Sequence, residues 1–437
     1  MTVYAEASPQ QTSSPVTRKS LPRKAMYGLG LGNTLEWYDW QIFGLLAAFI
    51  GPQFFAPGDP VSATLSALAV FAVGFAVRPL GGVLLGVVAD RVGRRTVMLL
   101  SISMMAITTF VIAICPTYEQ IGVWAGVILL ITRLVQGIST GIEAPLSTAY
   151  AVELSPKGRE GRAAGFMSFF VNIGILLASL TSFFTSLFIG TEAMGDWGWR
   201  LPFFFGAALG VIVIYMRRAL PESLHEEEKA GAPDTEEPGV WRGVRKHWVG
   251  LLAILFVVGA AQAYNYAWNV GLPNLARSAY KENSTWVFAI TSILGAILVF
   301  GSLVTGRMAD KWKVSRVFLI SRLLAIPSVF LMLLYTGPGI GGFAAVILGG
   351  SVVLVLNMTM YNLVSTSLMP KYCRATGVAL GYGVAVALFG GTASYLLVWM
   401  QQQGISWMFP VYVAVLSAIS VVLYLVARRT SGTFAAE

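Results

Sequence analysis

The sequence contains 437 residues, of which 56% are hydrophobic and only 12% are charged, with a mean hydropathy of +0.70 and a formal net charge of +9. An ordinary soluble domain carries charges on about a quarter of its residues, so this composition excludes that class of protein. The charged residues cluster between apolar runs of about 20 residues, the length of a helix that spans a bilayer. We therefore expect an all-α, polytopic membrane protein.

Twelve membrane-spanning helices are expected from these runs, arranged as two halves of six helices each. The expected spans are 26–50, 62–87, 96–115, 121–152, 162–188, 200–217, 246–275, 284–306, 315–336, 341–369, 374–401 and 404–428. Five segments follow from them: a disordered tail (1–25), an N-terminal bundle (26–217), an acidic linker (218–245), a C-terminal bundle (246–428) and a short tail (429–437).

Lysine and arginine are concentrated in the tails and in alternate loops, which places these segments in the cytoplasm by the positive-inside rule. Both termini and the linker are therefore expected inside, in a multi-pass protein of the cytoplasmic membrane. The same bias accounts for the positive net charge, so a nucleic-acid partner is not implied. Cys115 and Cys373 fall on opposite sides of the membrane without companion ligands, so neither a disulfide nor a metal site is expected.

The first span carries two carboxylates, Glu36 and Asp39, about halfway across the bilayer. Charges in hydrocarbon are costly, so they pair with one another or mark a path for a substrate or an ion. Arg133, in the fourth span, has a similar depth and is the expected counter-ion of both acids. Because His225 and His247 lie in or beside the linker, we expect one of the two carboxylates to carry a proton. A permanent ion pair that only stabilises the bundle is the alternative.

Two further charges, Arg78 in the second span and Glu143 in the fourth, lie in the cytoplasmic third of their spans. We expect them to pair and to help close an inner gate, with Glu143 as the next candidate proton carrier. A purely structural pair is equally consistent with the pattern, because long side chains near helix ends reach the interface. Arg322, in the ninth span, is interpreted as such a snorkelling residue.

The chain repeats itself at half its length. Residues 86–91 (Gly-Val-Val-Ala-Asp-Arg) match residues 306–311 (Gly-Arg-Met-Ala-Asp-Lys), and residues 162–165 (Arg-Ala-Ala-Gly) resemble residues 374–377 (Arg-Ala-Thr-Gly). Two repeated halves predict a substrate cavity at their interface, near the midplane, that opens alternately to each side of the membrane.

The second half offers uncharged polar side chains at the depth of this cavity. Tyr264, Asn265, Asn357 and Tyr361 are the expected substrate contacts, and Asn172 joins them from the first half. Amide and aromatic groups suit a small polar solute, although packing is the alternative role for the aromatic ones.

Several of these stretches resemble a known family. Residues 86–95 (Gly-x3-Asp-Arg-x-Gly-Arg-Arg) and 133–141 (Arg-x2-Gln-Gly-x3-Gly) resemble motifs of the major facilitator superfamily. Residues 33–39 (Asn-Thr-Leu-Glu-Trp-Tyr-Asp), 78–82 (Arg-Pro-Leu-Gly-Gly) and 141–143 (Gly-Ile-Glu) are similar to its metabolite:proton symporter family. Members of that family carry shikimate, α-ketoglutarate, citrate and other carboxylates, or proline and betaines, together with a proton.

The resemblance implies roles for further residues. It adds Asn33, Tyr38 and Gln136 to Arg133 as substrate contacts. It also implies a gating network, in which Asp90 and Arg94 latch the halves in the outward-open state. The expected gating residues are Arg78, Asp90, Arg91, Gly93, Arg94, Arg95 and Asp310. The sequence departs from the family at Ile142, where glycine is usual, and at Lys313, which replaces a glycine of the second loop motif.

The leading hypothesis is a secondary active transporter that moves a small organic acid together with a proton by alternating access, as a monomer and without a cofactor. One alternative is a proton-coupled importer of a zwitterion such as proline or a betaine, whose ammonium group would bind to aromatic rings. A second alternative is an exporter of hydrophobic compounds. An enzyme or a receptor has little support, because the sequence contains no recognisable catalytic triad, P-loop or metal cluster.

Overall fold

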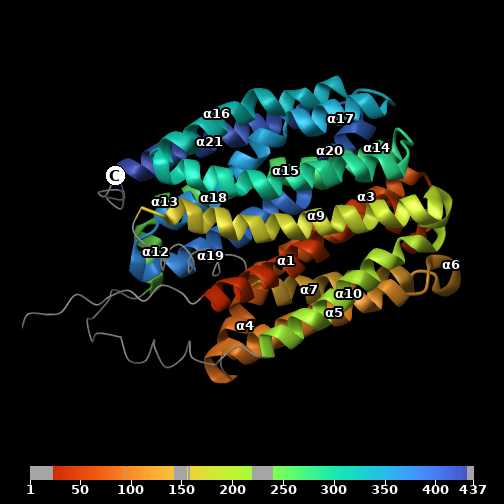
Figure 1. Ribbon diagram of the computed structural model, residues 1–437, viewed down its shortest axis with the longest axis horizontal. Helices are drawn as coiled ribbons and strands as arrows, with labels where there is room; N and C mark the ends of the chain where they lie inside the picture. The colour runs from red at the N-terminus through yellow and green to blue at the C-terminus, as the bar shows by residue number, and fades with distance from the viewer. Residues whose placement is uncertain (1–22, 93, 142–154, 156–157, 219–239, 431–437) are drawn as a thin grey trace, which may run out of the picture.

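The computed structural model describes residues 23–92, 94–141, 155, 158–218 and 240–430. Most of these residues lie in helices that run in roughly parallel or antiparallel directions through the molecule (Figure 1). The first helices are α1 (Arg23–Leu45), α2 (Ala47–Phe54), α3 (Pro60–Ala76), α4 (Arg78–Val92), α5 (Arg94–Ile114), α6 (Tyr118–Ile121), α7 (Trp124–Thr140), α9 (Glu160–Ala193), the π-helical turn η1 (Met194–Gly198) and α10 (Arg200–Arg218).

The second set follows residue 239. It comprises α12 (Val240–Lys246), α13 (Trp248–Tyr266), the π-helical turn η2 (Ala267–Gly271), α14 (Leu272–Ser278), α15 (Ser284–Lys311), α16 (Val314–Val329), the 3₁₀ turn η3 (Phe330–Leu334), α17 (Ile340–Gly349), α18 (Ser351–Ser367), the 3₁₀ turn η4 (Lys371–Cys373), α19 (Arg374–Ala385), the π-helical turn η5 (Val386–Gly390), α20 (Gly391–Gln402) and α21 (Met408–Thr430). We call α1 to α10 the N-terminal helices and α12 to α21 the C-terminal helices.

The predicted membrane fold is confirmed. Within the described ranges, nine helical segments are long and apolar enough to cross a membrane, and two shorter apolar helices lie at Trp124–Thr140 and Arg200–Met216. Each of the twelve expected spans contains a helix, although part of the fourth, 142–152, lies outside the described residues.

One helix was not expected: α12 occupies 240–246, and all but its last residue lie in the segment predicted as a linker, 218–245. Its Val244 is buried, and Gly243 lies directly against the ring of Tyr372. The short helix is therefore held by packing against the loop before α19, a contact that the local sequence does not reveal.

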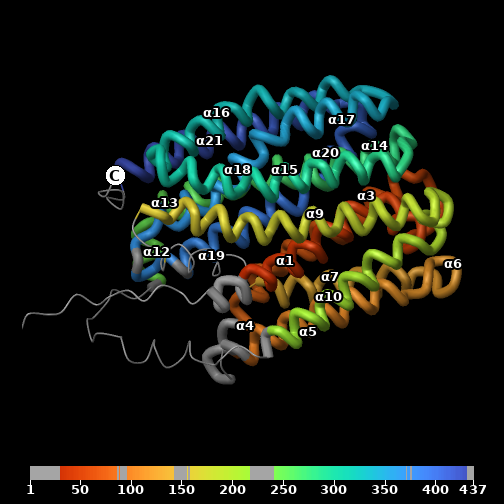
Figure 2. Tube along the Cα trace, in the orientation of Figure 1, coloured from red at the N-terminus to blue at the C-terminus, as the bar shows by residue number. Residues whose placement is uncertain are grey.

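The N-terminal and C-terminal helices meet along α9 and α15, which run side by side through the middle of the molecule (Figure 2). Glycines allow this close approach: a Cβ atom at Gly165 would lie 2.7 Å from the carbonyl oxygen of Ser302 and 3.0 Å from Cα of Gly306. A second contact between the two sets joins α3 to α20.

Interruptions of the helices coincide with the polar region. Leu46 separates α1 from α2, Val77 separates α3 from α4, and the π-helical turns η2 and η5 interrupt the seventh and eleventh spans. Such irregular turns change the direction of side chains and release backbone groups from the helical ladder, and they are frequent at functional sites. The sequence therefore builds a rigid bundle with irregular backbone near its centre.

Candidate functional site

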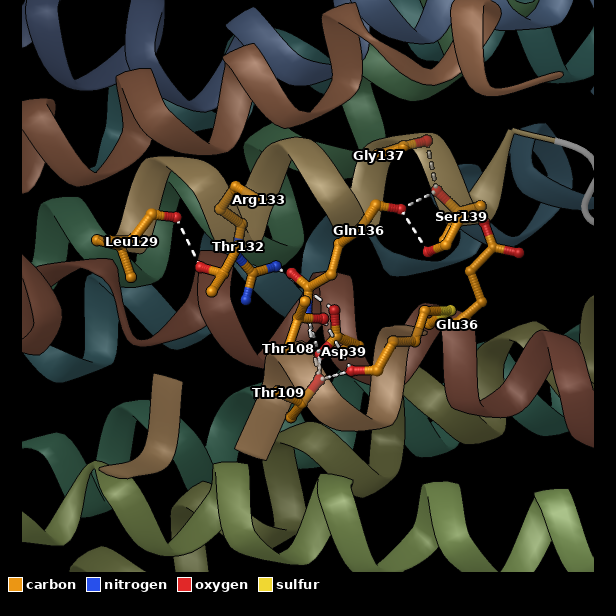
Figure 3. Close-up of polar contacts among 12 residues, drawn as sticks. Glu36, Asp39, Thr108, Thr109, Leu129, Thr132, Arg133, Gln136, Gly137 and Ser139 are labelled. Carbon is orange, nitrogen blue, oxygen red and sulfur yellow. Dashed lines mark hydrogen bonds and ion pairs between the residues drawn. The ribbon is translucent and has the colours of Figure 1, made fainter. Parts of the chain in front are cut away.

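The two carboxylates of α1 are enclosed by the bundle. Glu36 is 1% exposed and Asp39 is 2% exposed, and Asn33, one turn before Glu36, is also buried. Figure 3 shows Thr109, Arg133 and Gln136 gathered around Asp39. A buried ion is tolerated only when opposite charges and hydrogen-bond donors surround it, so the partners of each acid define the site.

Asp39 is held by three side chains of the N-terminal helices. Nη1 of Arg133 lies 3.5 Å from Oδ2 of Asp39, and Nε2 of Gln136 donates to Oδ1 at 3.1 Å. The hydroxyl of Thr109 donates to the same Oδ1, and Gln136 also donates to Thr109 at 3.1 Å. All three partners belong to α5 and α7, so this cluster stays intact as long as the N-terminal helices move together.

Glu36 is paired with Arg78, not with Arg133. Nη2 of Arg78 contacts Oε1 of Glu36, while Nε of Arg78 donates to the hydroxyl of Thr140 at 3.0 Å. The prediction that Arg133 is the counter-ion of both acids is therefore confirmed for Asp39 and wrong for Glu36. Three residues advance a helix by about 300° and about 4.5 Å, so the two acids face different neighbours.

The break at Val77 places Arg78 at the start of α4, next to Glu36. Glu143, the predicted partner of Arg78, lies outside the described residues. Its pairing and its role as a proton carrier stay predictions.

Aromatic rings cover both guanidinium groups. Cζ of Arg133 lies 3.9 Å from the centre of the Phe43 ring and 5.9 Å from that of Trp40. Cζ of Arg78 lies 5.0 Å from the Trp40 ring and 5.2 Å from the Phe75 ring. Trp40 is thus shared by two cations, and the rings form a surface that binds positive charge through their faces.

Arg133 retains unused hydrogen-bonding capacity. It is fully buried, yet its Nε and Nη2 atoms have no hydrogen-bond partner among the described residues. A planar guanidinium fork is suited to a carboxylate, which accepts two parallel hydrogen bonds. The arrangement can therefore bind a carboxylate group in addition to Asp39.

Arg78 also lies close to the C-terminal helices. Its guanidinium interacts electrostatically with the hydroxyl of Tyr382 on α19. The rings of Tyr382 and Tyr361 are stacked at 6.3 Å, and Nε2 of Gln262 on α13 donates to the hydroxyl of Tyr361 at 3.2 Å. Arg78 therefore borders the other half, whereas the described partners of Asp39 all lie in one half.

From Gln262, a chain of hydrogen bonds runs along the seventh span and returns to α1. Asn265 donates to Oε1 of Gln262 at 3.3 Å, and Asn269 donates to Oδ1 of Asn265 at 2.8 Å. Gln41 of α1 then donates to the carbonyl oxygen of Asn269 at 2.8 Å. Among the predicted substrate contacts, Gln136 thus bonds to Asp39, and Asn265 and Tyr361 belong to the polar chain that returns to α1 at Gln41.

Other predicted substrate contacts use their polar groups elsewhere. The hydroxyl of Tyr38 donates to the carbonyl oxygen of Pro202 at 2.6 Å and lies 3.1 Å from the hydroxyl of Thr181, so it points into the N-terminal helices. Asn172 donates to the carbonyl oxygen of Leu298 at 3.0 Å, across the seam between α9 and α15. These contacts are those of packing residues, so the geometry gives the predicted binding roles no support.

Two predicted substrate contacts of the C-terminal helices also use their polar groups for packing. The ring of Tyr264 stacks on Trp268 at 4.2 Å, and its hydroxyl lies 3.0 Å from that of Ser328. Asn357 donates to the carbonyl oxygen of Ser321 on α16 at 3.1 Å. Both groups serve contacts within one half.

Arg322 does not snorkel to the membrane interface. It is 1% exposed, it donates to the carbonyl oxygen of Val257 on α13, and its guanidinium lies 5.3 Å from the centre of the Phe318 ring. The earlier interpretation is wrong because α16 turns this face toward α13 rather than toward lipid.

At the end of the bundle where α12 lies, Asp310 connects the two halves. Its Oδ1 accepts the backbone N–H of Gly161 at 2.7 Å and that of Arg162 at 3.3 Å, and Nε of Arg162 lies 3.1 Å from Oδ2. A carboxylate at the N-terminus of a helix is favourable because the free N–H groups carry partial positive charge. The corresponding N-terminal residues (Asp90, Arg91, Gly93, Arg94 and Arg95) have side chains outside the described set, so their latch role stays a prediction.

The sequence analysis missed Gln41, Thr109, Thr140 and Tyr382. Each is a polar residue in an otherwise apolar span, which is the signal that could have found it. Hydroxyl groups are inexpensive to bury because they can bond to their own helix, so such residues do not stand out among many similar ones.

The family follows from comparison with known proteins. Residues 29–391 match the model of the Major Facilitator Superfamily. The chain belongs to the major facilitator superfamily. It is therefore a membrane transporter, in agreement with the resemblance of its motifs.

Two relatives within this superfamily align with most of this chain. The chain is 31% identical over 432 residues to the ectoine/proline transporter ProP of Corynebacterium glutamicum, covering 94% of this chain and 84% of that protein. It is 29% identical over 411 residues to the proline/betaine transporter of Salmonella typhimurium, covering 91% of this chain and 81% of that protein.

The major facilitator fold itself is seen in solved structures. The crystal structure of a D-xylose-proton symporter superimposes with a TM-score of 0.70 at 18% identity, covering 93% of this chain and 97% of the other. The agreement extends over most of the chain, so the expected fold class of two six-helix halves is correct.

Proposed function

We propose that this transporter imports a small zwitterion of the proline or betaine class together with a proton. The observation that carries the proposal is the pair of buried arginines beside α1, which offers open hydrogen-bond donors and cation-binding rings within a few ångströms of each other. The names of the relatives favour this substrate class over the organic acid that we first expected.

Arg133 binds the carboxylate of the substrate in this proposal. Its Nε and Nη2 atoms supply two donors, while Nη1 keeps its contact with Asp39. Because Gln136 and Thr109 fix Asp39, the guanidinium is oriented before the substrate arrives. Preorganisation of this kind lowers the entropy lost on binding.

The ammonium group of the substrate binds to the aromatic rings. Trp40 lies 4.0 Å from Phe75 between ring centres, and Phe75 lies 5.2 Å from Tyr266. Trp40 and Phe75 face the guanidinium of Arg78, and aromatic faces of this kind also attract a quaternary or secondary ammonium. A substrate with only carboxylate groups would make no use of them.

Glu36 carries the proton. Its partner Arg78 lies close to Tyr382 of the C-terminal helices, so the surroundings of the Glu36–Arg78 pair change when the halves separate. A weaker contact with Arg78 favours proton uptake by Glu36, and a restored contact favours release. Asp39 keeps its partners in both states and serves as the fixed part of the site.

A small organic acid is the second candidate, because the open donors of Arg133 suit any carboxylate. A monoanion that enters with one proton also leaves the total charge of the buried site unchanged, which avoids the cost of an uncompensated charge. The orientation with both termini inside, the monomeric state and the inner-membrane location remain our predictions.

Purified protein in liposomes tests the proposal. With an acidic outside, labelled proline or glycine betaine should accumulate above equilibrium, and collapse of the pH gradient should release it. Shikimate, citrate and α-ketoglutarate should neither accumulate nor compete. Accumulation of an organic acid without uptake of either zwitterion would contradict the substrate class, and uptake indifferent to the pH gradient would contradict proton coupling.

A further inference from the structure

The first span is broken, and a residue of the other half fills the break. Leu46, with φ −93° and ψ 9°, separates α1 from α2. In a continuous helix the N–H of Ala48 would donate to the carbonyl oxygen of Gly44, four residues earlier. Here the amide of Asn274, on α14, takes both places: its Oδ1 accepts from Ala48 N at 2.8 Å, and its Nδ2 donates to Gly44 O at 2.6 Å.

The contact is reciprocal. Gln41, one turn earlier on α1, donates to the carbonyl oxygen of Asn269 at 2.8 Å, and Asn269 lies in the π-helical turn η2. In each of the two spans, the helical hydrogen-bond pattern is therefore interrupted where an amide side chain of the other span bonds to the backbone. Gly44 permits the approach, because a Cβ atom there would lie 2.8 Å from the Val270 side chain.

We infer that Asn274 is the residue that closes the α14 end of the transport path, by replacing one backbone hydrogen bond of the first span. Asn274 is fully buried in the closed arrangement. When the halves part at this end, the amide leaves, and Ala48 N–H and Gly44 C=O can bond directly to each other. The helix then becomes continuous, so opening exposes no unpaired backbone group of α1.

This inference concerns gating and stands whatever the substrate is. Without the amide of Asn274, the closed state leaves the N–H of Ala48 and the C=O of Gly44 buried and unpaired, whereas the open state loses no hydrogen bond. Unpaired buried groups are costly, so the population shifts toward the state that is open at the α14 end. Alternating access then requires that the opposite end, where Asp310 bonds to α9, closes more firmly.

Two cysteine reporters test the shift, each in a background with Cys115→Ser and Cys373→Ser. Ala47→Cys reports on the α14 end beside the break, and Ala309→Cys reports on the Asp310 end; both positions are buried. An impermeant maleimide is applied to whole cells and to inverted vesicles, so that both faces of the membrane are sampled. Labelling rates are compared between native Asn274 and Asn274→Leu, a substitution of similar volume.

We expect Asn274→Leu to raise the labelling rate of Ala47→Cys about tenfold, which corresponds to about 1.4 kcal/mol, and to lower that of Ala309→Cys. Substrate affinity from the α14 side should be retained while maximal transport falls. Ser278→Ala is the matched control, because Ser278 bonds only to the carbonyl oxygen of Asn274 within its own helix. It should leave both rates unchanged.

Unchanged labelling at both reporters in Asn274→Leu would overturn the inference. A rise at both ends would also overturn it, because it indicates general loosening of the fold. If Asn274→Leu does not reach the membrane, Asn274→Ala removes the same two hydrogen bonds without adding volume. It must then give the same opposite shifts, or the inference fails.

Discussion

The two ion pairs on α1 are alike in chemistry but differ in what surrounds them. Nη1 of Arg133 lies 3.5 Å from Oδ2 of Asp39, and Asp39 also accepts hydrogen bonds from Thr109 on α5 and Gln136 on α7. Glu36 and Arg78 lie one turn away, and Arg78 lies close to Tyr382 of the C-terminal helices. Both pairs belong to the N-terminal helices, but only the second borders the surface that separates during transport.

This difference suggests how a single helix can provide both a binding site and a proton carrier. A group whose neighbours stay fixed keeps the same charge through the cycle. A group whose counter-ion gains and loses a neighbour in the other half is held more or less firmly with the motion, so it can gain and lose its proton. The identity of the acid matters less than whether its partner borders the other half.

The largest effect is expected at Arg133. Arg133→Ala leaves Asp39 buried without its counter-ion, and breaking such a pair costs about 3–5 kcal/mol, so uptake should fall at least about 100-fold. Arg133→Lys keeps the charge but loses the planar fork, and it should raise the apparent KM about tenfold while the protein still reaches the membrane. Uptake kinetics and surface expression measure both.

Arg322→Lys is the matched control for Arg133→Lys, because Arg322 is equally buried but lies among the C-terminal helices. It should change thermal stability without changing KM. An unchanged KM in Arg133→Lys would remove the carboxylate anchor from this site.

An intermediate effect is expected at Tyr382. Tyr382→Phe removes the hydroxyl that interacts with Arg78 and Tyr361, so Arg78 loses a polar contact with the C-terminal helices. Uptake driven by a pH gradient should fall about tenfold, while exchange at equal pH falls less. Tyr424→Phe, which removes a hydrogen bond to Ser315 inside the C-terminal helices, should affect both modes equally.

The smallest effect is expected at Thr109. Thr109→Val keeps the shape but removes one donor to Asp39, so affinity should fall about threefold to tenfold. Thr109→Ser should restore it. Because the cluster is part of the fixed half, the pH dependence of uptake should not move in either variant; a displaced pH profile would mean that Asp39 titrates during transport.

The charged residues and the Asp39–Arg133 pair could be predicted from the sequence, but the partner of Glu36 could not. Glu36, Asp39 and Arg133 stand out because charges are rare in apolar spans. The partner of Glu36 depends on the rotation of α1 and on the break at Val77, which hydropathy does not show. Arg322 was misplaced for the same reason, since only packing shows which face of α16 meets α13.

The central claim is that Glu36 titrates during transport while Asp39 does not. The most direct test compares Glu36→Gln with Asp39→Asn in liposomes, measuring substrate exchange at equal pH and accumulation driven by a pH gradient. We predict that Glu36→Gln retains exchange and loses accumulation, whereas Asp39→Asn loses both because it disturbs Arg133. Accumulation at the wild-type level in Glu36→Gln, with wild-type pH dependence, would contradict the account.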